Sequence, residues 1–143
     1  MLTLIGTLNS PYTRKTRLML LENKIPHKFI IDLPRDTNSQ IIKYNPLKRI
    51  PVLMLEDGAC VFDSPVITEY IDGMSGGNLI PNDVHERMIV KRWEAIVDGI
   101  MDAAVQVRME RERKIEQQDQ PLIDKNNNAI SLALRFINNE LET

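Results

Sequence analysis

Residues 2–13 read LTLIGTLNSPYT, a short apolar run that stops at Gly6 and a loop that leads into Ser10-Pro11. The apolar run predicts a β-strand that ends at the glycine. Serine is a residue type that caps helices, and proline suits the first helical position because its missing N–H would have no partner there. We therefore predict a strand followed by a helix, with Leu18 and Leu21 on one face of that helix.

The residues that follow, as far as residue 76, continue an alternation of strands and helices. Ser64 is expected to cap a helix with Pro65 at its first position, and Glu56-Asp57-Gly58 predicts a hairpin turn between two strands. The order is βαβαββα, and a hairpin after a βαβ unit predicts a mixed sheet with helices on both faces. The remaining elements are a strand over 27–32, a short helix over 39–44, and strands over 52–55 and 59–62.

The second half of the chain changes to a purely helical pattern. Residues 77–83 are expected to form a linker, after which Asp83 and Glu86 fit a capping-box-like helix start and Pro121 fits the first turn of another helix. Each helix carries an apolar stripe at helical spacing. The stripes contain Ile89, Trp93, Ile96, Val97, Ile100 and Ala104 in the first helix, and Ile123, Ile130, Leu134, Ile137 and Leu141 in the second.

The composition is that of an ordinary folded protein. Of the 143 residues 43% are hydrophobic and 27% are charged, which is enough for a buried core. The formal net charge of -2 gives no electrostatic reason to expect nucleic acid as a partner. The apolar stretches fall short of the ~20 residues that a membrane span needs, so no membrane association is expected.

The cysteine and histidine content argues against disulfides and metal. Cys60 is the single cysteine, so no intramolecular disulfide can form, and with no signal peptide this favours the cytoplasm. Cys60 lies between apolar residues and is expected in the core. His27 and His85 have no cysteine partner at finger-like spacing, so no metal is expected.

Four segments resemble the cytosolic glutathione S-transferase family, and in particular its bacterial glutathione transferase-like members. They are SPYTRK at residues 10–15, NPLKRIPVL at 45–53, FDSPVI at 62–67 and DGIMD at 98–102. The resemblance implies a thioredoxin-like, glutathione-binding domain over 1–76, a linker over 77–83 and an all-α domain over 84–143. In the family this helical domain continues further, so the resemblance also implies that the helical domain is incomplete here: either the chain is truncated, or a partner supplies the missing cover.

The resemblance implies a role for Ser10 at the glutathione sulfur. In the family the hydroxyl at this position donates to the sulfur and favours the thiolate, which is the competent nucleophile. A hydroxyl cannot form a mixed disulfide, which argues against thiol–disulfide exchange of the glutaredoxin type. Three alternatives remain open at this stage: Ser10 is only a helix cap, Thr13 contacts the sulfur in its place, or the Tyr12 phenol does so.

The other implied roles concern the peptide part of glutathione. Pro51 matches the family's cis-proline, which exposes the backbone of Ile50 for pairing with the cysteinyl residue, although an ordinary trans proline is the alternative. Ser64 is expected to hold the γ-glutamyl carboxylate and Asp63 to approach its ammonium group, unless Ser64 only caps its helix. Lys48 or Arg49 is expected to pair with the glycyl carboxylate, with the equal alternative that both side chains are simply solvated.

These expectations lead to one leading function and one alternative. The leading function is a glutathione S-transferase of the detoxification type, which activates the glutathione thiol for attack on a small apolar electrophile and uses glutathione as co-substrate. The alternative is a non-catalytic interaction or regulatory module with the same fold. In either case the two apolar stripes of the helical half require burial, so a homodimer is expected.

Overall fold

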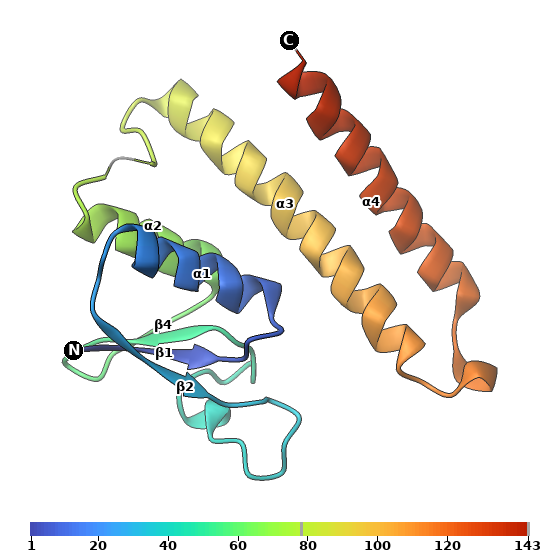
Figure 1. Ribbon diagram of the computed structural model, residues 1–143, viewed down its shortest axis with the longest axis horizontal. Helices are drawn as coiled ribbons and strands as arrows, with labels where there is room; N and C mark the ends of the chain where they lie inside the picture. Colours follow the sequence, from blue (N-terminus) through green and yellow to red (C-terminus); the bar gives the residue numbers. More distant parts are fainter. Residues whose placement is uncertain (78, 143) are drawn as a thin grey trace. The chain divides into compact units, whose positions relative to one another are not determined.

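The structure is a computed structural model that describes residues 1–77 and 79–142. The chain forms two compact units, Met1–Arg87 and Met88–Thr143. Residues 78 and 143, which belong to the expected linker and to the end of the expected helical domain, lie outside the described residues. The elements, coloured along the chain in Figure 1, are β1 (Leu2–Gly6), α1 (Pro11–Glu22), β2 (His27–Ile31), η1 (Ile41–Lys43), β3 (Val52–Met54), β4 (Cys60–Val61), α2 (Ser64–Met74), α3 (Val84–Arg111), η2 (Ile115–Gln117) and α4 (Gln120–Leu141).

The first unit is built on a four-stranded mixed sheet of order β2-β1-β3-β4. β1 pairs in parallel with β2 and antiparallel with β3, and β3 pairs antiparallel with β4. The parallel pair is connected through α1, whereas the hairpin turn connects β3 with β4. The predicted fold class, a thioredoxin-like α/β domain followed by helices, is therefore confirmed.

The sheet separates two apolar clusters, because neighbouring side chains on a strand point to opposite faces. On one face Leu2 and Leu4 of β1 pack with Leu53 of β3 against α1 and α2, which contribute Leu20, Ile67 and Ile71. On the other face Ile5 and Val52 pack with Ile41. The β1 and β3 residues named here are at most 6% exposed, so these two central strands are buried on both sides, whereas Ile30 and Ile31 of the edge strand β2 are 47% and 65% exposed.

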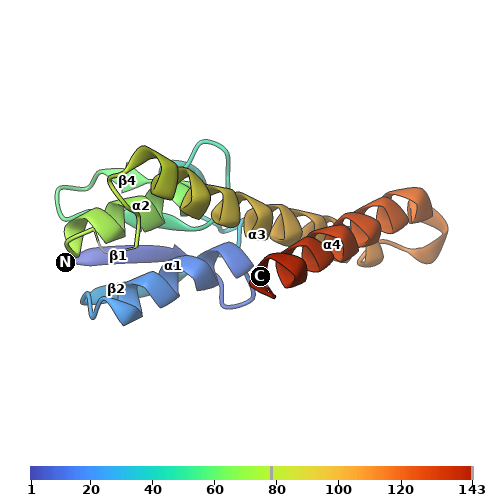
Figure 2. The same ribbon diagram turned by 90° about the horizontal axis from the view of Figure 1, so that it is seen from above.

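α1 and α2 cover the same face of the sheet and contact each other; seen from above they lie side by side (Figure 2). The buried residues of α1 are Thr13, Thr16 and Leu20. Leu18 and Leu21, which the sequence places on one face of this helix, are both more than half exposed. The two small threonines occupy the buried positions instead, where the helix approaches its neighbours.

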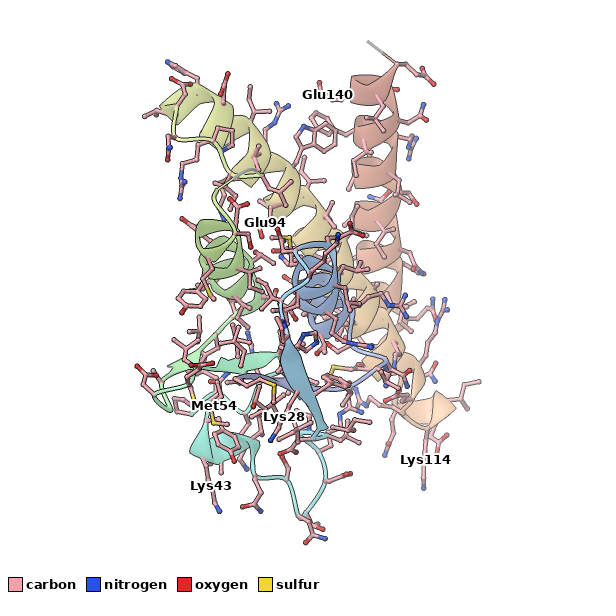
Figure 3. The ribbon with its side chains drawn as sticks, turned by 60° about the vertical axis from the view of Figure 1, so that its left-hand side comes forward. Lys28, Lys43, Met54, Glu94, Lys114 and Glu140 are labelled. Atoms are coloured by element: carbon pink, nitrogen blue, oxygen red, sulfur yellow. The ribbon has the colours of Figure 1, made fainter. Side chains whose placement is uncertain are left out.

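The expected helix over 39–44 is reduced to η1, a single 3-10 turn of three residues. It lies on the face of the sheet opposite α1 and α2, where Figure 3 shows its Lys43. Ile41 from this turn fills the second cluster, and Tyr44 packs beside it. This face is therefore covered by a single 3-10 turn together with side chains such as Ile50 and Phe62, so only this short turn meets the expectation of helices on both faces.

The end of α2 is connected to the following segment through a buried carboxylate. Asp72 is 3% exposed and accepts hydrogen bonds from the backbone N–H groups of Leu79 and Ile80 at 2.9 and 3.0 Å. α3 then begins as predicted: the Asp83 carboxylate accepts from the N–H of Glu86 at 3.0 Å. Arg87 in the first turn of α3 forms an ion pair with Glu69 of α2.

The second unit is an antiparallel pair of helices. Near one end Arg92 of α3 pairs with Glu140 of α4 at 2.7 Å and stacks over the ring of Phe136. Near the other end Glu110 is 8% exposed and accepts the N–H of Asp119, which caps α4. No helix within the described ranges is long and apolar enough to cross a membrane.

Gly6 lies where β1 meets α1 and leaves no room for a side chain. A Cβ at this position would come within 2.4 Å of Thr13 Oγ1 and 3.1 Å of Thr13 Cβ. Since Thr13 is fully buried, its side chain has little freedom to move away. The first turn of α1 therefore depends on the missing side chain of Gly6.

We predict that Gly6→Ala lowers the free energy of unfolding by about 1–3 kcal/mol through overpacking. The same substitution in a Thr13→Ala background should cost less, because the two closest atoms have been removed. Urea denaturation of the four proteins in this double-mutant cycle measures the coupling. Additive costs of the two substitutions would contradict the predicted contact.

Candidate functional site

The register of the sheet brings the three sequence motifs to one edge. Ile5 near the end of β1 pairs with Val52 at the start of β3, and Leu53 pairs with Val61 at the end of β4. Ser10 follows β1, Pro51 precedes β3, and residues 63 and 64 follow β4. Because these strand ends adjoin, the segments that leave them begin at the same edge of the sheet.

Ser10 occupies the N-cap of α1, as the sequence predicted. Its Oγ accepts a hydrogen bond from the N–H of Thr13 at 3.2 Å, and its carbonyl accepts from the N–H of Arg14 at 2.9 Å. A serine hydroxyl has two acceptor lone pairs and one donor hydrogen. Capping uses a lone pair, so the hydrogen can still donate to an anion. The capping role and the sulfur-binding role of Ser10 are therefore compatible.

Thr13 is not available to a ligand. Its side chain is fully buried, and Oγ1 has no hydrogen-bond partner within the described part of the chain. It lies so close to Gly6 that a Cβ added there would come within 2.4 Å of Oγ1. Its burial therefore argues against the alternative that Thr13 contacts the sulfur. Tyr12 is half-buried beside Pro11 in the first turn of α1.

Ile50 lies just outside the sheet with its side chain anchored. The Ile50–Pro51 peptide bond is cis, the isomer that the resemblance implies. The side chain of Ile50 packs against the cluster of Ile5, Ile41 and Val52. β3 begins only at Val52, and within the described residues no hydrogen bond uses the N–H or C=O of Ile50. Its backbone therefore remains available for pairing.

Sequence reasoning missed the residue that organises the loop before Ile50. Asn45 is 1% exposed; its Nδ2 donates to the carbonyl of Arg49 at 3.0 Å, and its Oδ1 accepts from the N–H of Leu47 at 2.9 Å. Its backbone N–H and C=O bond to Ile41 and Lys48. The hint available in the sequence was that asparagine side chains bond to the backbone two residues further on.

The third motif differs from its prediction at the helix start. Asp63, not Ser64, occupies the N-cap of α2, after a Phe62–Asp63 peptide bond that is also cis. The Asp63 side chain makes no capping hydrogen bond within the described residues. Ser64 is the first helical residue and is 2% exposed. The helix dipole and the N–H groups of this turn favour an anion.

The two cationic candidates project from the same loop. Lys48 and Arg49 are both exposed, and Lys48 has a left-handed backbone with φ of 50°. They directly precede Ile50, so their positive charge lies next to the backbone that is free for pairing. Neither side chain is held in a fixed position by burial.

A cavity of about 650 Å³ lies at the edge of the sheet opposite the three motifs. Its lining includes Leu2 at the start of β1, Leu55 after β3 and Met74 at the end of α2. None of the candidate site residues lines it. Within the described ranges no group of three or more His, Cys, Asp or Glu side chains is placed to hold a metal ion.

Comparison with known proteins identifies the family to which this fold belongs. The family model described as "Glutathione S-transferase, N-terminal domain" matches residues 9–74, which contain all three motifs. A glutathione S-transferase from Methylobacillus flagellatus KT, solved with glutathione bound, is 38% identical. It superposes with a TM-score of 0.95 over 100% of this chain and 71% of its own. The chain belongs to the glutathione S-transferase family.

Other members of the family are similar over part of their length. A glutathione transferase family member from Pseudomonas fluorescens Pf-5, solved with bound glutathione, is 35% identical with a TM-score of 0.85, covering 94% of this chain and 69% of its own. The uncharacterized GST-like protein YibF of Escherichia coli K12 is 41% identical over 82% of this chain and 58% of its own length. Glutathione S-transferase U17 of Arabidopsis thaliana is 33% identical over 66% of this chain and 43% of its own. The chain thus spans about half the length of these curated relatives.

Cys60 remains outside the site chemistry. The thiol is half-buried beside the second cluster, with Sγ 3.7 Å from the carbonyl oxygen of Gly58. Burial raises the pKa of the Cys60 thiol above its ordinary value. The thiolate is therefore disfavoured at neutral pH, as expected for a core residue rather than a nucleophile.

We predict that Cys60 reacts slowly with iodoacetamide in the folded chain. Because only the thiolate attacks, the rate should keep rising with pH beyond about 8.5, where an ordinary thiol begins to level off. The same chain in denaturant, in which the thiol is solvated, is the control. A folded-state rate that levels off at or below the pH of the denatured control would contradict the raised pKa.

Proposed function

We propose that this chain binds glutathione at the edge formed by the three motifs and activates its thiol for attack on a small apolar electrophile. The observation that carries the proposal is Ser10, a helix-capping hydroxyl whose hydrogen remains available at an amide-rich helix end. Family members solved with glutathione support the co-substrate. The reaction is the transfer of glutathione, with no metal involved.

The tripeptide would lie across the edge in an extended form. Its cysteinyl amide and carbonyl pair with the C=O and N–H of Ile50 in a short antiparallel bridge. The γ-glutamyl carboxylate is held at the first turn of α2, where Ser64 stands, and Asp63 approaches the ammonium group. Lys48 or Arg49 pairs with the glycyl carboxylate.

The hydroxyl of Ser10 then acts on the sulfur. A donated hydrogen bond and the positive end of α1 both stabilise the thiolate relative to the thiol. Lowering the thiol pKa from about 8.5–9 to about 6.5 increases the thiolate fraction at neutral pH by roughly two orders of magnitude. Serine cannot form a mixed disulfide, which favours conjugation over disulfide exchange.

Three variants of Ser10 separate catalysis from helix capping. Ser10→Thr keeps the cap and the donor, so conjugation of glutathione to chlorodinitrobenzene should persist. Ser10→Asp keeps the cap but only accepts hydrogen bonds and adds a negative charge, so the rate at neutral pH should fall about 100-fold. Ser10→Ala should lose the same activity and also about 1 kcal/mol of stability.

The apparent thiol pKa in the pH–rate profile provides the direct readout, and Thr13→Val is the matched control. The Thr13 hydroxyl is buried and has no hydrogen-bond partner among the described residues, so its isosteric replacement should leave the rate and the profile unchanged. A rate that survives Ser10→Asp would discard Ser10 as the sulfur partner. A chain that neither binds glutathione–agarose nor conjugates would favour the non-catalytic interaction module.

We also infer that the protein is a cytoplasmic homodimer that serves detoxification. Large apolar side chains remain exposed on α3 and α4, including Ile89, Val97 and Leu134, and association would bury them. The single cysteine fits a reducing compartment. Light scattering should give twice the mass of one chain; the mass of a single chain would remove the dimer.

A further inference from the structure

We propose that Asn45 is a positioning residue that aims the N–H of Ile50 at the cysteinyl carbonyl of glutathione. This inference rests on the proposed function, since it concerns how the glutathione edge is built. Asn45 does not itself approach the ligand in this proposal. It acts through the peptide group that joins Arg49 to Ile50.

Asn45 is buried, and its polar groups are satisfied by hydrogen bonds. The residue is 1% exposed, and four of its polar groups bond to the segment 41–49. The backbone N–H donates to Ile41, the backbone C=O accepts from Lys48, and Oδ1 accepts from Leu47, at 2.8, 2.9 and 2.9 Å. The amide side chain is therefore held rigidly inside the loop, and Nδ2 can point in only one direction.

Nδ2 of Asn45 contacts the peptide group between Arg49 and Ile50. Nδ2 donates to the carbonyl oxygen of Arg49 at 3.0 Å, and the Arg49–Ile50 peptide bond is trans. In a planar trans peptide the C=O and the following N–H point in opposite directions. Because Asn45 draws the Arg49 carbonyl into the loop, the N–H of Ile50 is turned outward, away from Asn45.

The side chain of Ile50 is also held in place. Its side chain packs into the cluster of Ile5, Ile41 and Val52, so the residue cannot rotate to bring its N–H back. Neither backbone group of Ile50 has a partner within the described residues. The two anchors leave one outward-pointing donor, which fits the carbonyl of an extended peptide.

Two variants remove the contact to different extents. Asn45→Ser can keep the turn bond to the N–H of Leu47, because serine forms the equivalent turn, but its side chain is too short to reach the Arg49 carbonyl. Asn45→Ala removes both bonds. Asp72→Ala is the matched control: Asp72 is equally buried, also bonds to two backbone N–H groups, and lies at the far end of α2 from Ser64.

The probe is S-methylglutathione, which has the peptide groups of glutathione but no thiol for Ser10 to activate. Calorimetric titration of the full chain should show affinity about ten-fold weaker in both Asn45 variants, the effect of one hydrogen bond, and unchanged in Asp72→Ala. In turnover the KM for glutathione should rise with the apparent thiol pKa unchanged. Wild-type affinity in a folded Asn45 variant would overturn the proposal.

Measurements on the wild-type chain test the positioning role of Asn45 even if a variant does not fold. In a nitrogen-15 labelled chain, the Asn45 side-chain amide should exchange slowly with solvent, and the Ile50 N–H should shift and become protected when S-methylglutathione binds. Rapid exchange of the Asn45 amide, or binding without any change at Ile50, would overturn the proposal. A wild-type chain that does not bind the probe at all would instead remove the glutathione site on which the proposal rests.

Discussion

The antiparallel pairing of β3 with β1 is the constraint on which the rest of the site depends. It places Ile5 opposite Val52, and both residues belong to the cluster below the sheet, whereas Leu4 and Leu53 belong to the cluster above it. A slip of one residue would exchange these two sets of side chains between the faces. Since both faces are buried, such a slip is strongly opposed. The register that places Pro51 near the end of β1 is thus maintained by the two cores.

The N-termini of α1 and α2, which meet at this edge of the sheet, are capped in different ways. α1 begins with a serine whose hydroxyl satisfies one of its own backbone N–H groups and retains a hydrogen for donation. α2 begins with an aspartate whose side chain makes no capping bond within the described residues. The N-terminus of α1 is thus suited to a polarisable anion, such as a thiolate, that accepts one hydrogen bond from a side-chain donor. The N-terminus of α2 is suited to a carboxylate that is bound by backbone N–H groups. Between them the backbone of Ile50 supplies a pairing edge.

Much of the first unit could be predicted because its signals are local. The apolar run before Gly6, the hairpin turn at Gly58 and the cap at Ser10 each determine a short piece of backbone regardless of distant contacts. Within α1, burial by distant elements overrides local preference. Leu18 and Leu21 are stronger apolar signals than Thr13 and Thr16, yet the threonines are buried, and at Thr13 the close approach of Gly6 leaves space only for a small side chain.

The sequence by itself determined the order of the elements, the positions of the helix starts and the family to which they point, because caps, turns and alternation act within a few residues. The tertiary structure alone decided which hydroxyl is accessible: Ser10 and Thr13 are separated by one helical turn, and only packing against β1 buries the second. It also revealed Asn45, a buried residue whose side chain makes two hydrogen bonds within the loop before Ile50. Such roles follow from which groups are excluded from water, and a linear pattern does not contain that information.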